Sequence, residues 1–284
     1  TIKLDGNYPT GTDNVALGNT ALDSVEAGGV QNTAIGANAG TAITTGDNNT
    51  AVGRNSLKTN TTGHSNVALG SSTLCKNVTG TRNVGIGLSA LFNTLEDSNT
   101  AIGASAMAAN TTGEYNVAVG DNALTSNTTA DSNTAVGFES LKTNITGADN
   151  TAMGLCSLRL NTTGGQNTAI GRKAMSNNIS GDNNTAIGRQ AMVANTTADD
   201  NTAVGAQALE NNTTGTQNVA VGATSLDANT TGCMNTAVGR SALTTNTTGL
   251  CNTAVGRTAM ELNVSGCFNT AVGKDSLANN TTAN

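Results

Sequence analysis

Few side chains of this chain have the types and spacing that catalysis needs. His64 is the only histidine among the 284 residues, and it lies in a stretch typical of a turn. No serine or cysteine has a second histidine-based partner, and no pair of carboxylates lies in a recognisable apolar pocket. We therefore predict a protein that is not an enzyme, with a carboxylate-only glycosidase as the remaining catalytic alternative.

Acidic residues gather near the end of a repeated unit and raise the question of a metal site. Asp182 and Asp199 share a position in adjacent units, so stacking would bring them about 5 Å apart, which could attract Ca²⁺. Arg240, Arg257 and Lys274 repeat at the same interval with like positive charge, and screening by solvent accounts for both columns. The glycine-rich calcium repeat GGxGxD is absent. We predict no metal site and no cofactor.

The cysteines do not form a zinc-binding pattern, because none belongs to a CxxC pair or lies near a histidine cluster. The five are Cys75, Cys156, Cys233, Cys251 and Cys267. Cys233 and Cys267 occupy one position of units two apart, and stacked strands would separate them by roughly 9 to 10 Å, too far for a disulfide. The odd number leaves at least one thiol free or paired with another chain, and we expect small free thiols.

The triplet N-x-[ST] recurs late in the repeated unit and is a candidate acceptor of N-linked glycans. The asparagines concerned are Asn60, Asn77, Asn110, Asn127, Asn144, Asn161, Asn178, Asn195, Asn229, Asn246, Asn263 and Asn280. These triplets are copies of one motif rather than independent signals. The structural alternative is that asparagine stacks in a ladder and caps a turn, with Thr or Ser bonded to the backbone.

Composition and charge exclude several classes of function. The chain contains two Tyr, three Phe and no Trp but 34 Gly, so its interior must consist of small and β-branched side chains. A net charge of −6 and the lack of aromatic platforms argue against nucleic acid as a partner. No apolar run is long enough for a membrane helix, and no signal peptide is recognisable. Because the chain starts without Met and stops within a repeat, we expect a fragment of a longer fibre.

A seventeen-residue repeat organises nearly the whole chain. Sixteen copies begin at an asparagine, the first at Asn14 and the last at Asn269, with one eighteen-residue and one sixteen-residue step. Position one is Asn and position five is Gly in every copy, position two is Thr or Val, and position four is aliphatic or Met. Position three is Ala except for Gly85, and positions eight and nine are a small residue followed by Leu or Met, with Gly40 as the exception at position nine.

This pattern predicts an all-β, parallel β-solenoid, or β-roll, of about sixteen coils. The alternation in NTAVG, with its β-branched residues and terminal Gly, is typical of a short strand. Gly at position fifteen indicates a corner with an unusual dihedral angle. One coil cannot bury enough apolar surface alone, so the coils must stack. We predict a lead-in segment over residues 1–13 and a repeat array over residues 14–284.

The two faces of the strand predict self-association. We expect the side chains at positions two and four to point inward, which places the Ala at position three on the outside. An uncharged stripe of Ala suggests a close-packed contact in a closed oligomer, most readily a homotrimer of intertwined or side-by-side chains. The alternative is that Ala faces a narrow interior. The predicted interface residues are Ala51, Ala68, Ala101, Ala118, Ala135, Ala152, Ala169, Ala186, Ala203, Ala220, Ala237, Ala254 and Ala271.

The motif NTAVG, followed by AL and NTTG, resembles the head repeats of trimeric autotransporter adhesins, with their similar S-V-A-I-G core. It resembles more closely the seventeen-residue repeats in tail-fibre and spike proteins of bacteriophages and other large viruses. The opening LDGNYPTGTDNVALGNTAL looks like the beginning of such an array, and the similarity covers residues 14–284. The resemblance implies a homotrimeric β-roll on a virion or cell surface. It also implies that a host glycan or protein is bound by a tip or neighbouring domain.

The leading functional interpretation is a structural fibre or shaft segment, or a head segment, that presents an attachment tip. An ice-binding solenoid is an alternative, because ranks of Thr at strand and coil spacing could order water. Against it, the Thr residues at position two alternate with Val and are expected to be buried. A glycan-coated extracellular fibril built from such chains is a further alternative.

Overall fold

The computed structural model describes residues 11–283, and none of these residues is helical. The sequence hypotheses on residues 1–10 lie outside this range. The chain divides into two compact units, residues 1–139 and residues 140–284. Unit 1 contains β1 to β8 and unit 2 contains β9 to β16, each strand three residues long. The strands are β1 Val15–Leu17, β2 Thr33–Ile35, β3 Thr50–Val52, β4 Val67–Leu69, β5 Val84–Ile86, β6 Thr100–Ile102, β7 Val117–Val119, β8 Thr134–Val136, β9 Thr151–Met153, β10 Thr168–Ile170, β11 Thr185–Ile187, β12 Thr202–Val204, β13 Val219–Val221, β14 Thr236–Val238, β15 Thr253–Val255 and β16 Thr270–Val272.

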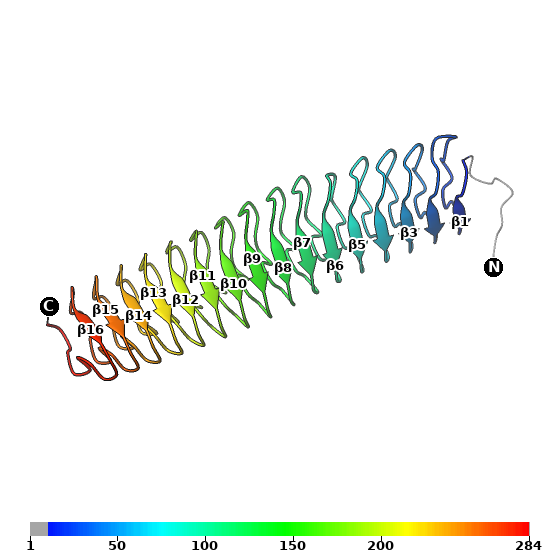
Figure 1. Cartoon of the computed structure of the whole chain (residues 1–284). Coiled ribbons are helices and arrows are strands. Elements are labelled where there is room, and N and C mark those ends of the chain that lie inside the picture. The colour runs from blue at the N-terminus through cyan, green and yellow to red at the C-terminus, as the bar shows by residue number, and fades with distance from the viewer. Residues whose placement is uncertain (1–10, 284) are drawn as a thin grey trace. The chain divides into compact units, whose positions relative to one another are not determined.

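Within each unit, every strand pairs in parallel with the strand of the next coil (Figure 1). The register joins equal repeat positions, so that Thr168 lies opposite Thr185 and Ala169 opposite Ala186. Backbone bonds continue along the turns, where for example Met192 N donates to Ala208 O at 2.9 Å. The predicted all-β parallel β-solenoid of roughly seventeen-residue coils is therefore confirmed.

The alanines at position three line the interior of the coil, which corrects the predicted oligomer interface. Each of the thirteen alanines predicted to form the interface is at most 3% exposed in the single chain, so none of them offers surface to another molecule. The corrected residues are Ala51, Ala68, Ala101, Ala118, Ala135, Ala152, Ala169, Ala186, Ala203, Ala220, Ala237, Ala254 and Ala271. Positions two and four point outward instead. The physical reason is the narrowness of the coil, because Leu or Met from position nine leaves room only for a methyl group across from it.

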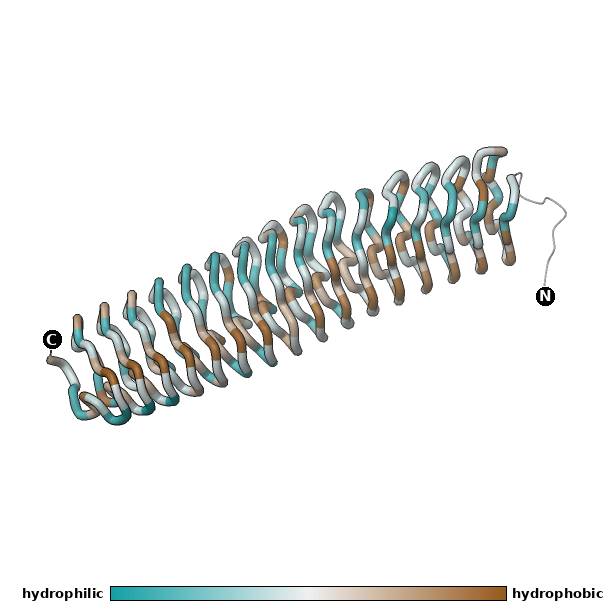
Figure 2. The backbone as a smooth tube through the Cα atoms, in the orientation of Figure 1, coloured by the Kyte–Doolittle hydropathy of each residue, from teal (hydrophilic) through white to brown (hydrophobic). Residues whose placement is uncertain are grey.

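The core of each unit is a column of Leu and Met side chains from position nine, accompanied by small residues from positions three and eight. Leu57, Leu124, Met192 and Leu226 are among the largest side chains with full burial. Hydrophobic residues recur at matching places in successive coils (Figure 2). An interior of small side chains, as the composition predicts, is what the structure has.

The glycine at position five is required by both dihedral angle and space. Its φ lies between +118° and +143° in all sixteen coils, a range that residues with a side chain rarely adopt. A Cβ at Gly120 would also come within 2.5 Å of Gly137 O in the next coil. Alanine at this position would therefore strain the backbone and displace the neighbouring coil.

The predicted unusual dihedral at position fifteen is wrong, because the glycines there do not have positive φ. Their small size matters instead, since a Cβ at Gly164 would lie 2.5 Å from Gly181 O and 2.6 Å from Asn161 Oδ1. The left-handed conformations belong to residues with side chains at positions seven, nine and seventeen. Examples in one coil are Asn122, Leu124 and Ser132, with φ between 51° and 59°.

The two exceptions within the core are compensated by a neighbouring side chain. Gly40 replaces Leu at position nine, and Ile43 occupies the space, since a Cβ at Gly40 would lie 2.9 Å from Ile43 Cδ1. Gly85 replaces Ala at position three because Thr73 of the preceding coil is larger than the usual Ala or Ser. A Cβ at Gly85 would lie 2.6 Å from Thr73 Cγ2. Interior volume is therefore conserved across adjacent coils.

Candidate functional site

The asparagines at position twelve form a buried side-chain ladder. Asn127 Nδ2 donates to Asn110 Oδ1 of the preceding coil at 2.8 Å and to Ala130 O of its own turn at 2.9 Å. In unit 2 the ladder continues without a break from Asn144 to Asn280. Each Nδ2 donates both of its hydrogens to acceptors inside the solenoid. The amide therefore stabilises the turn and is not available to solvent.

This burial contradicts the predicted glycosylation sites, because a glycan must reach an exposed Nδ2. Eleven of the candidates are fully buried, namely Asn60, Asn77, Asn110, Asn127, Asn144, Asn161, Asn178, Asn195, Asn229, Asn246 and Asn263. Asn280, in the final coil, is partly exposed, but its Nδ2 makes the same pair of contacts, to Asn263 Oδ1 and Ala283 O. The structural alternative for the N-x-[ST] triplet is the one that the geometry supports.

A second buried ladder consists of the asparagines at position one. Asn184 Oδ1 accepts from both the backbone N and the Nδ2 of Asn201, at 3.0 and 3.2 Å. The Nδ2 of Asn201 also donates to Gly215 O at 2.9 Å, which ties the strand to the turn of its own coil. The invariance of Asn at this position follows, because the ladder needs an acceptor and two donors from one short side chain.

The acidic side chains at position sixteen accept hydrogen bonds from backbone N–H groups of the preceding coil. Asp182 Oδ1 accepts from Gly165 N at 2.7 Å, and Asp199 Oδ1 accepts from Asp182 N at 2.8 Å. Cys233 fills the same role with its Sγ, 3.3 Å from Thr216 N. Across residues 11–283, no group of three or more potential metal-ligating side chains is present. A structural contact therefore explains the repeated carboxylates.

The remaining candidates for chemistry are isolated. His64 is exposed, and its Nδ1 lies 3.4 Å from Ser65 Oγ. None of the five cysteines forms a disulfide, and each is partly buried. Burial raises the pKa of the Cys75 thiol, and the nearby Lys58 and Lys76 oppose that effect. A raised pKa reduces the thiolate fraction at neutral pH, so Cys75 is not an activated nucleophile.

The outward side of the strands forms an uncharged surface in each unit, which we call the strand face. It consists of the Thr or Val at position two and the aliphatic or Met side chain at position four. Ile102 in unit 1 and Ile170 and Val238 in unit 2 are 37–38% exposed on it. Eight strands spaced about 4.8 Å apart, each about 10 Å long, give a flat area of roughly 400 Å² per unit. Apolar patches of this size on soluble proteins mark contact surfaces.

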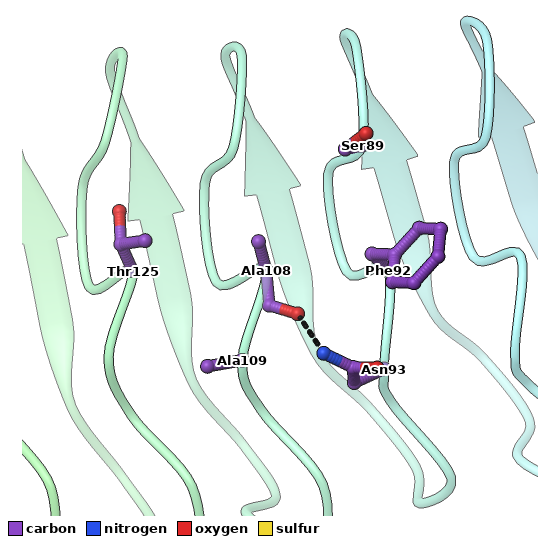
Figure 3. A pocket seen from close by; sticks show the side chains of 6 residues that line it. All are labelled: Ser89, Phe92, Asn93, Ala108, Ala109 and Thr125. Atoms are coloured by element: carbon purple, nitrogen blue, oxygen red, sulfur yellow. Dashed lines mark hydrogen bonds between the residues drawn. The ribbon is translucent and has the colours of Figure 1, made fainter.

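A depression of about 310 Å³ lies in unit 1, on three successive coils (Figure 3). Its lining residues come from positions seven, ten and eleven: Ser89, Phe92, Asn93, Ala108, Ala109 and Thr125. The hollow exists because the coil of residues 99–115 has alanine at both variable positions, between the larger Phe92 and Thr125. The sequence signal for this site is the aromatic residue at position ten followed one coil later by Ala-Ala, which the repeat analysis passed over.

The coil of residues 83–98 supplies Ser89, Phe92 and Asn93 to the depression, and we call it the short coil because it has sixteen residues. Thr94 takes the place of the ladder asparagine there, and Asn77 Oδ1 is left buried without a hydrogen-bond partner. On the other side, Asn110 Nδ2 reaches Thr94 Oγ1 only at 3.5 Å. The side-chain ladder of position twelve is thus interrupted at the short coil.

No family model matches the chain, and no curated protein matches it. Over the part that the structure describes, no helix is long and apolar enough to cross a membrane.

Proposed function

We propose that this chain is a structural, non-enzymatic segment of a fibre. It would serve as the shaft or head of a virion tail fibre or of a surface adhesin, outside the cell or on the virion, and hold an attachment tip away from the surface. The observation that carries this proposal is the continuity of two ladders within each unit, one of strand backbones and one of the asparagines at position one. In unit 2 the asparagines of position twelve add a third unbroken ladder, from Asn144 to Asn280. Bending or stretching must therefore break several hydrogen bonds at once.

The proposed fibre is a homotrimer whose chains meet through the strand face rather than through alanine. The face is flat, carries no charge, and leaves aliphatic side chains exposed along every unit. Cyclic assembly buries such a surface in all copies by the same contact. The exposed position of these side chains also means that they can be changed without disturbing the core.

The test is solution mass by analytical ultracentrifugation. We expect a trimer for the natural chain and a monomer for the pair Val221→Lys and Val238→Lys, because burying two ammonium groups in each contact is costly. Leu262→Lys is the matched control, since Leu262 is 43% exposed but belongs to position eleven, outside the strand face. A monomeric natural chain contradicts the homotrimer, and a trimer unaffected by the pair contradicts this choice of face.

One observation favours ice binding as a second candidate function. The Thr side chains of position two lie on the strand face, partly exposed, in a column with the spacing of parallel strands. The expectation that they are buried, which spoke against this function, is wrong. A measurement of thermal hysteresis decides the matter: activity that is lost on replacing Thr168 and Thr185 with Lys supports ice binding over the fibre segment.

The glycan-coated fibril loses its support, because eleven of the twelve asparagines on which it relied are buried and Asn280 Nδ2 donates to Asn263 Oδ1 and Ala283 O. The absence of sugar additions in an intact-mass measurement of the secreted chain would agree with this conclusion.

A further inference from the structure

We propose that the depression beside Phe92 binds a pyranose ring of a neutral glycan, so that this segment itself contacts sugars in addition to supporting a tip. The site lies within unit 1, away from the strand face. It depends on a local departure from the repeat and not on the oligomeric state.

The composition of the site sets it apart from the equivalent surface elsewhere. The coil of residues 99–115 is the only one with alanine at both positions ten and eleven, and Phe92 is the only aromatic residue at either position. Side chains of adjacent coils normally cover this surface. Here Ala108 and Ala109 leave a trough bordered by Phe92 on one side and Thr125 on the other (Figure 3).

The spacing of the coils that border the trough suits one six-membered ring. Phe92 and Thr125 belong to coils two apart, which places their backbones roughly 9 to 10 Å from each other. Lys76 Nζ lies 5.2 Å from the centroid of the Phe92 ring and restrains it by a cation–π contact. The electron-rich face of an aromatic ring attracts the polarised C–H groups of a sugar.

The polar atoms around the trough are mostly acceptors. Asn93 Nδ2 donates to Ala108 O at 2.8 Å, which leaves its Oδ1 to accept (Figure 3). Thr125 Oγ1 donates to Ser105 O at 3.2 Å and retains its lone pairs. Ser89 Oγ makes no hydrogen bond among residues 11–283 and can donate or accept. A fitting ligand therefore supplies several hydroxyl hydrogens.

The charge and the chemistry of the lining together select a neutral sugar. None of the six lining residues is charged, so the lining itself offers no ion pair to repay an anionic or cationic ligand for its lost hydration. A purely apolar side chain from a protein partner would cover the free acceptors without satisfying them. A pyranose offers an apolar C–H face to Phe92 and Ala108 and hydroxyl groups to the rim.

The test is saturation-transfer NMR on the full chain with methyl glycosides of glucose, galactose and N-acetylglucosamine, each at millimolar concentration. We expect at least one to bind, and Phe92→Ala to weaken it by about tenfold through loss of the aromatic contact. Ala109→Leu fills the trough while keeping the ring and should abolish binding. Phe268→Ala, which removes a phenylalanine that is 75% exposed at another site, should leave it unchanged.

Two results would overturn the proposal: no binding by any glycoside, or binding that survives both Phe92→Ala and Ala109→Leu. Binding of p-cresol, a mimic of an aromatic side chain, in preference to the sugars would also overturn it. Thermal unfolding by circular dichroism verifies that the variants are folded. Because the substitutions lie outside the strand face, the trimer mass should not change, and a failure of sugar binding is distinguishable from a failure of the fibre proposal.

Discussion

The short coil, residues 83–98, and a regular coil of unit 2, residues 184–200, differ by one residue in length and by one interrupted ladder. In the regular coil, Asn195 donates to Asn178 Oδ1 at 2.8 Å and accepts from Asn212 Nδ2 at 3.3 Å. In the short coil, Thr94 leaves Asn77 Oδ1 unpartnered. The strand is nevertheless intact in both, since β5 pairs with β4 and β6 in full register.

This comparison separates two kinds of constraint on the repeat. The asparagine ladder of position one continues through the short coil, where Asn99 N donates to Asn83 Oδ1 at 3.0 Å. The backbone pairing of β5 with β6 is preserved as well. The ladder of position twelve is lost, because the short coil has Thr94 at this position and Thr has no Nδ2 to donate to Asn77 Oδ1. A solenoid thus tolerates variation in one turn, and the irregular turn belongs to a coil that lines the depression beside Phe92.

The largest expected effect comes from alanine at the glycine of position five. Gly188→Ala forces a side chain onto a residue with φ of 140°, with its Cβ 2.6 Å from Gly205 C. We expect a loss of roughly 3 kcal/mol in the free energy of unfolding, measured by urea denaturation. Gly87→Ala in the short coil should cost as much, because its φ of 128° places the Cβ 2.6 Å from Gly103 O. Markedly unequal losses would show that the backbones of the two coils differ.

The next largest effect is expected for Asn195→Thr, which gives the regular coil the threonine that the short coil has at position twelve. Asn195→Thr removes the donor to Asn178 Oδ1, a buried acceptor, and should lower the free energy of unfolding by about 2 kcal/mol. Val193→Thr, at the half-buried position ten of the same coil where Thr125 and Thr244 occur naturally, is the control and should change little. If Asn195→Thr leaves the free energy of unfolding unchanged, then water or a rearranged turn replaces the hydrogen bond of the ladder.

A smaller effect concerns the packing around β5. Gly85→Ala brings a methyl group against Thr73 Cγ2 and should destabilise unit 1 by about 1.5 kcal/mol. The double variant Gly85→Ala with Thr73→Ala restores the combination found in most coils and should recover most of that loss. Additive losses in the double-mutant cycle would contradict the compensation inferred from the structure.

The smallest effect is expected for a substitution that restores the side-chain ladder in the short coil. Thr94→Asn supplies a donor for Asn77 Oδ1 and should raise the free energy of unfolding by about 1 kcal/mol. The urea midpoint of the variant should increase relative to the natural chain, whereas Thr94→Val, which supplies no donor, should not stabilise. If Thr94→Asn destabilises instead, the shortened turn cannot hold an asparagine in the ladder geometry.

The fold was predictable from the sequence because a strict period reports a stacked architecture. Invariant Asn and Gly, the alternation in NTAVG and the scarcity of aromatic residues together predict short parallel strands and a core of small side chains. The same pattern could not say which face of the strand is inside. Alternation is symmetric: residues such as Thr168 and Ile170 on one face and Ala169 on the other satisfy it in either orientation.

The candidate sites were less predictable, since their properties depend on burial and on contacts between coils. Asn127 belongs to a glycosylation triplet in the sequence, and only the stacked neighbour Asn110 shows that its amide is occupied. The depression beside Phe92 requires residues of three coils to lie next to one another, and the equivalent residues Phe92, Ala108 and Thr125 are sixteen and seventeen positions apart in the sequence.

By itself, the sequence determined the period, the parallel strands, the stacking register and the positions where glycine is required, because these are local or repeated properties of the chain. Only the tertiary structure decided that alanine is inside, that Thr and the aliphatic residues are outside, and that the asparagines form ladders. The physical reason is volume: a coil of seventeen residues encloses room for one Leu or Met and a few small groups, and that limit exists only when the coil is closed.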